Sequence, residues 1–184
     1  RQFDANGNLR DWWDKDVKKK FLDRAQCIID QYGKIKVPTT GLYLNGKLTQ
    51  GENIADNGGV KQAFRAYKRF LEKQGEEKRI EGLEQYSNEQ IFFIGFAMIY
   101  CGHTTQDELI DWILTDYHSP DRYRVNQVLA NQPEFAAAFN CDAPSTVLSK
   151  YSQKPQHSDF YDISGTELYH SWYEFKKKKL QYGI

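Results

Sequence analysis

Two acidic residues in the stretch at residues 51–59 have the type and spacing that could hold or orient a metal ion. Glu52 and Asp56 are four residues apart, so a helix through this stretch places both carboxylates on one face, about one turn apart. Acidic pairs with this spacing also occur on ordinary solvated helix faces. The spacing alone therefore leaves a metal-related pair and a solvated face as alternatives.

The two acids lie near the start of a helix that we predict over residues 50–73. A turn at Asn45-Gly46 is expected to precede it. Gly58-Gly59, inside the helix, indicates close approach of another backbone, with a break in the helix as the alternative. The apolar residues of the predicted helix form one stripe with spacings of three and four, which is typical of a helix face packed in a core. These residues are Val60, Ala63, Phe64, Tyr67, Phe70 and Leu71.

Start and stop signals predict further helices on both sides of this one. Ser87 and Gln90 form a capping box, and Ser119-Pro120 supplies a cap followed by proline at the first helical position. The predicted helices cover residues 14–32 (capped by Asp11 or Asp14 and ended by Gly33), 87–101, 107–115 (capped by Thr105), 120–130 and 133–139, with a short amphipathic helix at 166–180.

Composition excludes some classes of function. The 184 residues hold 25 basic and 25 acidic side chains, so bulk charge gives no reason to expect a nucleic acid partner. The longest nearly apolar run, at residues 91–101, is shorter than the about 20 residues that cross a bilayer, so no membrane segment is expected in this chain. Cys27, Cys101 and Cys141 are odd in number and far apart, which leaves buried thiols and partners outside the chain as alternatives.

A series of motifs over residues 1–141 resembles the neprilysin and endothelin-converting-enzyme family of zinc metallopeptidases. The central match is to the family motif G-E-N-I-A-D, at residues 51–56. The other matching segments are Phe3-Asp4 to Trp12-Trp13, Cys27, Gln31-Tyr32-Gly33, Leu44-Asn45-Gly46, Phe64-Arg65-Ala66-Tyr67, Phe92-Phe93, Cys101, Asp116-x-His118-Ser119-Pro120 to Arg124-Val125, and Phe135 to Cys141.

The resemblance implies a role for four residues. Glu52 matches the third protein ligand of a catalytic zinc ion, and Asp56 matches the acid that hydrogen-bonds a zinc-binding histidine. His118 matches the histidine that donates to the oxyanion, and Arg124 the arginine that holds a substrate carbonyl. Without the resemblance, His118 would be a capping or packing residue and Arg124 part of a helix-surface ion pair.

The sequence also departs from the family pattern. The family's H-E-x-x-H motif, which carries two zinc ligands and the general base, is absent, because none of the four histidines has that spacing. The N-A-F/Y substrate motif is absent as well. We therefore expect both to lie in an N-terminal part of the same polypeptide that precedes this sequence. One carboxylate does not hold a catalytic zinc, so the isolated chain is expected to be inactive.

The C-terminal part departs too. Residues 142–184 form an atypical tail, which lacks the family's C-x-x-W ending. The family pairs that cysteine with the match of Cys27, and pairs the matches of Cys101 and Cys141 with upstream cysteines. The resemblance thus implies a disulfide-bonded protein that is extracellular or at the cell surface, either secreted or anchored by a single span.

These observations predict a mainly α fold, the C-terminal part of a gluzincin (thermolysin-like) catalytic domain with few short strands. The resemblance implies a zinc-dependent metalloendopeptidase that hydrolyses peptide bonds in oligopeptides, with one Zn²⁺ ion whose other two ligands lie upstream. The alternative is a non-catalytic peptide-binding or interaction fragment of the same fold. A helical scaffold without a ligand is a third interpretation, in which the four candidate residues would point in unrelated directions.

Overall fold

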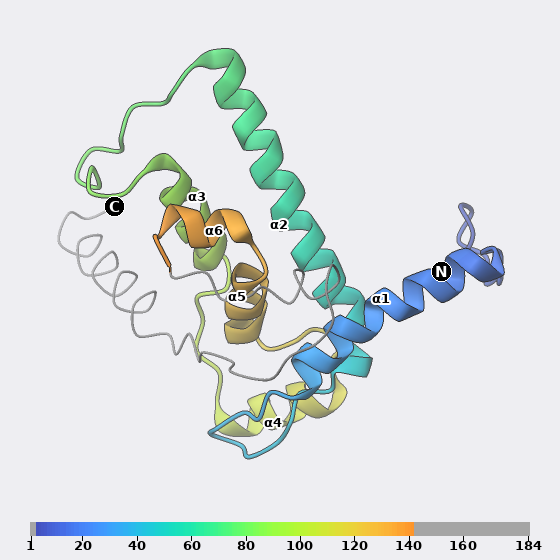
Figure 1. Ribbon diagram of the computed structural model, residues 1–184. Coiled ribbons are helices and arrows are strands. Elements are labelled where there is room, and N and C mark those ends of the chain that lie inside the picture. The colour runs from blue at the N-terminus through green and yellow to red at the C-terminus, as the bar shows by residue number, and fades with distance from the viewer. Residues whose placement is uncertain (1–2, 142–184) are drawn as a thin grey trace. The chain divides into compact units, whose positions relative to one another are not determined.

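The computed structural model describes residues 3–141, and six helices account for most of them. Outside the helices, the described residues form two isolated antiparallel bridges, Phe3 with Leu9 and Lys36 with Tyr43. The prediction of a mainly α fold with few short strands is confirmed. The predicted helix at 166–180 lies outside the described residues. In chain order (Figure 1), the helices are α1 (Lys15–Gly33), α2 (Gly46–Gln74), α3 (Asn88–Met98), α4 (Gln106–Thr115), α5 (Asp121–Ala130) and α6 (Pro133–Ala138).

The chain divides into two compact units, and α2 runs through the boundary between them. Within the described residues, the first unit combines residues 3–54 with Gln106–Ser119, and the second combines Ala55–Thr105 with residues 120–141. Glu52 therefore belongs to the first unit, whereas Asp56 belongs to the second.

In the first unit, α1 begins where the sequence predicts. The Asp14 side chain accepts hydrogen bonds from the backbone N–H groups of Asp16 and Val17, which satisfies two of the helix's unpaired donors. The helix ends at Gly33. The buried apolar residues of this unit are Ala25, Tyr32, Val37, Leu44 and Ile113.

The start of α2 differs from the prediction. Asn45 and Gly46 do not form a separate turn, because Gly46 is the first residue of α2 and the Asn45 side chain caps the helix, accepting from the Leu48 N–H at 3.0 Å. Gly46 also lies against α1. A Cβ atom at this position would collide with the Ile29 carbonyl oxygen and would lie 2.8 Å from the Gly33 nitrogen. Glycine is needed here because two backbones meet.

The second unit is built around an apolar cluster that joins four helices. Val60 and Phe64 of α2 pack in this cluster with side chains of α3, α5 and α6, and Figure 1 shows those three short helices beside one another. The predicted capping box at Ser87 and Gln90 is present and opens α3. The buried members of the cluster are Val60, Phe64, Phe93, Val128, Leu129 and Phe135.

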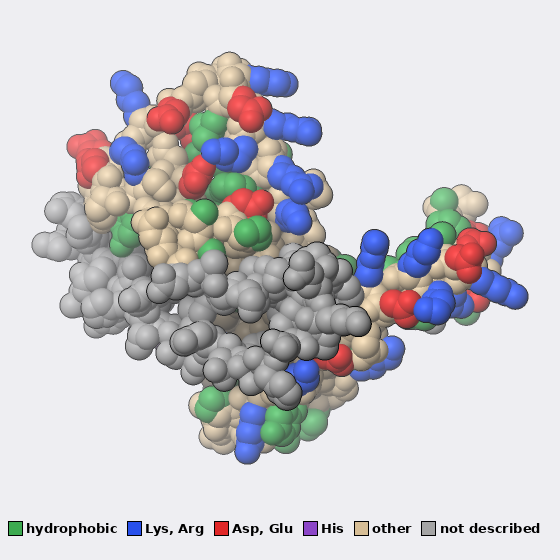
Figure 2. Space-filling model, in the orientation of Figure 1, with side chains coloured by type: hydrophobic (Ala, Val, Ile, Leu, Met, Phe, Trp, Pro, Cys, Tyr) green, Lys and Arg blue, Asp and Glu red, His purple; other side chains and the backbone are tan. Residues whose placement is uncertain are grey.

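The opposite face of α2 is charged, which makes the helix amphipathic. Lysine and arginine side chains stand along the exposed edge of α2, with acidic side chains beside them (Figure 2). The pair Gly58-Gly59 lies inside this helix without breaking it, and among residues 3–141 a Cβ at either glycine would meet no atom within 4 Å. Both explanations that the sequence suggested for the glycine pair, close approach of a backbone and a helix break, are therefore wrong.

Two further sequence features can be located within residues 3–141. No helix there is long and apolar enough to span a membrane. Cys27 is half-buried and Cys101 and Cys141 are exposed, and this part of the chain contains no disulfide.

Candidate functional site

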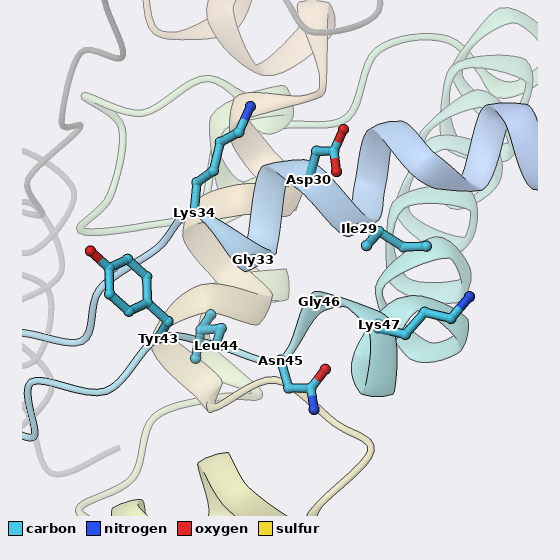
Figure 3. A pocket seen from close by; sticks show the side chains of 9 residues that line it. All are labelled: Ile29, Asp30, Gly33, Lys34, Tyr43, Leu44, Asn45, Gly46 and Lys47. Atoms are coloured by element: carbon cyan, nitrogen blue, oxygen red, sulfur yellow. The ribbon is translucent and has the colours of Figure 1, made fainter.

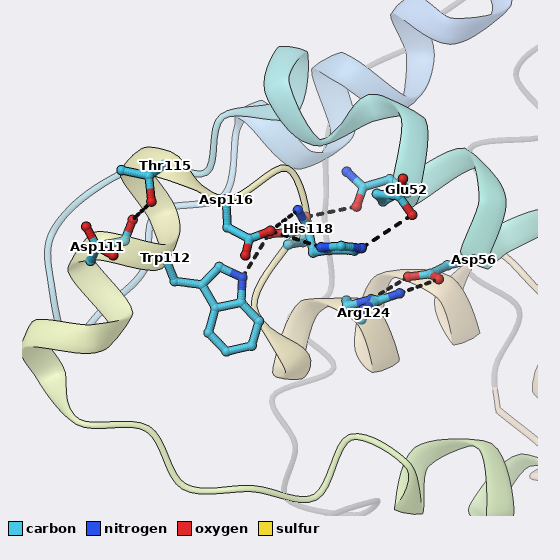
Figure 4. Close-up of polar contacts among 10 residues, drawn as sticks. Glu52, Asp56, Asp111, Trp112, Thr115, Asp116, His118 and Arg124 are labelled. Atoms are coloured by element: carbon cyan, nitrogen blue, oxygen red, sulfur yellow. Dashed lines mark hydrogen bonds and ion pairs between the residues drawn. The ribbon is translucent and has the colours of Figure 1, made fainter. Parts of the chain in front are cut away.

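His118 lies in the short loop that follows α4, and it is held both at its ring and at its backbone. The Asp116 carboxylate accepts hydrogen bonds from the His118 backbone N–H at 2.6 Å and from ring atom Nδ1 at 2.9 Å (Figure 4). Trp112, on α4, donates its indole N–H to the His118 carbonyl oxygen at 3.1 Å. Because a carboxylate only accepts, Nδ1 carries a proton and Nε2 is turned outward.

Nε2 of His118 faces Glu52. The distance from Nε2 to Glu52 Oε2 is 3.5 Å, and both side chains keep solvent contact, with 30% and 39% of their surface exposed. Partial exposure leaves both groups accessible to a ligand. The structure thus brings Glu52 and His118 together in the first unit, although each residue comes from a different element.

In the second unit, Asp56 and Arg124 form a two-point ion pair. Arg124 Nε donates to one carboxylate oxygen at 2.7 Å, and Nη2 donates to the other at 2.8 Å (Figure 4). The side chains are 11% and 19% exposed, so the pair is largely withdrawn from water. The hydrogen bonds to Asp56 raise the pKa of Arg124 further above its ordinary value.

The guanidinium group has two further neighbours. Its central carbon lies 4.9 Å from the centre of the Tyr100 ring, in a cation–π contact. Burial, and then the negative charge of Asp56, raise the pKa of Tyr100. Burial also raises the pKa of Asp121, and the positive charge of Arg124 acts in the opposite direction. Tyr100 therefore faces Arg124 as a neutral phenol at physiological pH.

Glu52 and Asp56 are each followed by an asparagine that bonds to a distant part of the same unit. Asn53 follows Glu52 and accepts a hydrogen bond from the Ser119 hydroxyl at 2.8 Å. Asn57 follows Asp56 and accepts one from the Asn131 side chain at 2.9 Å. Because neighbouring residues on a helix point about 100° apart, each acid can face a ligand while its asparagine faces the packed side.

Sequence reasoning gave no site role to several residues of this arrangement, among them Asp116, Asn53 and Ser119. Asp116 could have been found, because an Asp two residues before a histidine commonly accepts that residue's backbone N–H. The predicted role of Ser119 as the cap of α5 is wrong, since the helix has no side-chain cap and Pro120 occupies the cap position. The Ser119 hydroxyl binds Asn53 instead, and no local pattern indicates a partner so distant in sequence.

The side chains that could bind a metal ion can be compared with the number of protein ligands that a catalytic zinc ion requires. Within residues 3–141, no group of three or more histidine, cysteine, aspartate or glutamate side chains is arranged to hold a metal ion. A catalytic zinc ion takes three protein ligands and keeps one open position. Glu52 offers one carboxylate of the right kind, so this part of the chain fits a contribution to a zinc site and does not complete one.

The structure also has a surface hollow where α1 ends and α2 begins (Figure 3). Its volume is about 490 Å³. Tyr43 and Lys34 stand at its rim, and the backbone of Gly33 and Gly46 forms part of its wall. None of the four candidate residues Glu52, Asp56, His118 and Arg124 lines this hollow.

Comparison with known proteins places these residues in a family context. The profile of Peptidase family M13 matches residues 1–154. Neprilysin-1 of Caenorhabditis elegans is 58% identical over 146 residues, which cover 79% of this chain and 19% of the relative. Human neprilysin is 42% identical over 142 residues, covering 77% of this chain and 19% of the relative. The chain thus spans about a fifth of the length of these curated relatives.

Solved structures agree with the sequence comparison. The zinc metalloprotease Zmp1 of Mycobacterium tuberculosis, in complex with an inhibitor, superposes with a TM-score of 0.68 at 31% identity, over 80% of this chain and 22% of that one. A chain of the Haemonchus galactose containing glycoprotein complex also has a TM-score of 0.68, at 43% identity, over 76% of this chain and 23% of that one. The resemblance seen in the sequence motifs is confirmed, and the chain belongs to peptidase family M13.

Proposed function

We propose that the full-length protein that carries this chain is a zinc-dependent metalloendopeptidase that hydrolyses peptide bonds in oligopeptides. The observation that carries the proposal is the approach of His118 Nε2 to within 3.5 Å of Glu52 Oε2, with both side chains partly exposed. A carboxylate able to bind a metal then stands beside a hydrogen-bond donor, as hydrolysis of a polarised carbonyl requires. Family membership supports the same reaction class.

In this proposal, Glu52 is one of three protein ligands of the zinc ion. The other two ligands and the general base come from polypeptide outside this chain. Bound zinc would supply a Lewis acid and an activated water molecule. The contribution of α2 is to present the Glu52 carboxylate from a rigid helix, on an exposed face.

His118 would stabilise the negative charge that develops on the substrate carbonyl oxygen. With a proton on each ring nitrogen, His118 would donate Nε2–H to that oxygen, while the hydrogen bond from Nδ1 to Asp116 keeps the ring in place. A donor fixed in advance for charge that appears in the transition state is worth about 3–4 kcal/mol. The 2.6 Å bond from the His118 backbone to Asp116 restrains the loop in the same orientation.

Arg124 would hold a backbone carbonyl of the peptide substrate. Its Nε and Nη2 atoms are engaged by Asp56, so Nη1 is the edge that would meet the carbonyl oxygen. The Asp56 carboxylate would also accept a hydrogen bond from a zinc-binding histidine contributed by the rest of the protein. The two roles of Asp56 are compatible because each carboxylate oxygen can accept more than one hydrogen bond.

The proposal extends to location and partners. A peptide is the expected substrate, and the rest of the same polypeptide is the expected structural partner. An extracellular or cell-surface protein, with disulfides from Cys27, Cys101 and Cys141 to cysteines outside this chain, is consistent with neprilysins as relatives. The second candidate function is a non-catalytic peptide-binding module, favoured by the incomplete ligand set within residues 3–141.

Elemental analysis and peptide cleavage by the full-length protein test the proposal. The wild-type protein is expected to contain one zinc ion per chain and to cleave oligopeptides. Glu52→Gln should lose both zinc and activity, because a neutral amide is a poor zinc ligand. Glu72→Gln, an exposed position further along α2, is the matched control and should keep both. A wild-type protein that binds peptides without zinc or cleavage would exclude the peptidase and leave the binding module.

A further inference from the structure

Two almost completely buried polar side chains are the immediate neighbours of Glu52 and His118. Asn53 is 1% exposed and Ser119 is 0% exposed. The Ser119 hydroxyl donates to Asn53 Oδ1 at 2.8 Å, across 66 residues of sequence. A buried hydrogen bond between such distant residues holds two segments in one relative position, because breaking it leaves unpaired polar atoms away from water.

The orientation of the Asn53 side chain is itself determined by a second bond. Its Nδ2 group donates to the Thr49 hydroxyl oxygen at 2.9 Å, and that hydroxyl donates to the Asn45 carbonyl oxygen at 3.0 Å. Because the nitrogen faces Thr49, the carbonyl oxygen of the amide must face Ser119. The Ser119 hydroxyl is thus the first donor in a directed chain of hydrogen bonds that ends at the carbonyl oxygen of Asn45, the residue that caps α2.

The Ser119 hydroxyl does not cap α5, although its position before Pro120 would favour such a cap. A serine before a proline at a helix start usually caps the helix, yet α5 has no side-chain cap. The hydroxyl turns away from the helix end and into the protein, toward Asn53. The Ser119 hydroxyl thus forms a long-range hydrogen bond to Asn53 in place of a helix cap on α5.

We propose that Asn53 and Ser119 are positioning residues that hold the His118 loop against Glu52, an inference that rests on the proposed function for the role of His118. The bond connects the residue after Glu52 to the residue after His118, so the loop cannot move away from α2 while it is intact. An error of about 1 Å in the position of a catalytic group can lower a rate by about 100-fold. We therefore expect loss of the bond to act on catalysis through His118.

The first test needs no activity. The Trp112 indole N–H donates to the His118 carbonyl oxygen, so its hydrogen exchange, measured by NMR in the 184-residue chain, reports on the loop. Ser119→Ala should accelerate this exchange about tenfold or more relative to wild type. Asn131→Ala is the matched control, because it removes an equally long-range amide bond in the other unit, and it should leave the exchange near the wild-type rate. Equal exchange in wild type and Ser119→Ala would overturn the proposal.

The second test is a double-mutant cycle on kcat/KM in the full-length protein. Ser119→Ala alone should lower kcat/KM about tenfold, and it should have less than about a twofold effect when His118 is already changed to Gln. Asn131→Ala should cause the same fold-change in both backgrounds. If Ser119→Ala also acted equally in both backgrounds, it would be a general structural residue and the inference would be wrong.

A third variant covers the case in which Ser119→Ala does not fold. Ser119→Cys keeps the shape of the side chain and a weaker donor. The Trp112 exchange rate and kcat/KM of this variant should therefore lie between the wild-type values and the values expected when the bond to Asn53 is lost completely. Values outside that interval, in a variant with the wild-type melting temperature, contradict the proposal.

The proposed function and this inference can fail separately. An inactive wild-type protein would contradict the proposed function. The Trp112 exchange would still decide whether the bond between Ser119 and Asn53 holds the loop.

Discussion

Asp56 and Arg124 meet through two parallel hydrogen bonds of 2.7 and 2.8 Å, with the Tyr100 ring against the guanidinium group. Only the guanidinium group can engage both oxygens of a carboxylate in one plane. The pair joins α2 to α5 within the second unit, and little of it touches water. The Asp56–Arg124 pair should therefore contribute more to stability than an ion pair at the surface does.

Arg124→Ala should destabilise the chain by about 1–3 kcal/mol, because it leaves the largely enclosed Asp56 carboxylate without its partner. Urea unfolding followed by circular dichroism measures this change. Lys68→Ala is the control, since it removes an ion pair with Glu89 whose side chains are 48% and 35% exposed, and it should cost only about 0–1 kcal/mol. Similar losses in the two variants would show that burial of the Asp56–Arg124 pair has no special effect.

Replacing Gly46 by alanine should destabilise the first unit by about 1–3 kcal/mol or prevent its folding. The added methyl group would collide with the Ile29 carbonyl oxygen, which belongs to the backbone of α1 and cannot rotate away. Gly58→Ala and Gly59→Ala are controls in the same helix, where a methyl group meets no atom of residues 3–141 within 4 Å. Each should raise stability by about 0.5–1 kcal/mol through helix propensity. Thermal unfolding of the three variants distinguishes the positions.

Stability should fall at high pH because of Tyr67. Burial, followed by its hydrogen bond to Glu77, raises the pKa of Tyr67 to about 12. Folding then favours the protonated phenol, so its contribution is complete below a pH of about 10 and is lost as the pH rises toward 12. Tyr67→Phe should lose about 0.5–1.5 kcal/mol at neutral pH, the value of one hydrogen bond, and should show a smaller decline between pH 10 and 12.

Urea unfolding at pH 8, 10 and 11.5 checks this prediction. Tyr43→Phe, at an exposed position, is the control and should keep the wild-type decline. A Tyr67→Phe variant that declines as steeply as wild type would assign the alkaline loss of stability to other groups.

The capping box of α3 provides a prediction about local structure. The Ser87 hydroxyl accepts the Gln90 backbone N–H at 3.1 Å, and the Gln90 side chain accepts the Ser87 N–H at 2.7 Å. Ser87→Ala should cost about 0.5–2 kcal/mol, whereas Ser87→Asp keeps an acceptor at the cap and should cost much less. Melting temperatures of the two variants test the difference, and equal losses would contradict a capping role.

Much of the helical framework could be predicted from the sequence. The caps at Asp14 and Ser87 and the core-facing residues Val60, Phe64 and Tyr67 of α2 depend on residues no more than a few positions apart. Such interactions are formed within one helix, so the sequence records them directly.

Ala63 and Phe70 are exposed, so the prediction that the whole apolar stripe of α2 faces the core is wrong at these two positions. The spacing of Glu52 and Asp56 is equally local, and it predicted that both acids lie on one helix face. Spacing alone left a metal-related pair and a solvated face as alternatives, and the family resemblance favoured the first.

The tertiary structure decided which residues meet. Gly46 serves a helix crossing and not a turn, and Ser119 binds Asn53 and does not cap α5. The contacts of His118 with Glu52 and of Arg124 with Asp56 likewise join segments that are far apart in sequence. Residue types and spacing say nothing about such distances, because they depend on how helices pack in three dimensions. The physical reason is that helix caps need only a few neighbouring residues, whereas these contacts exist only when the core around them has formed.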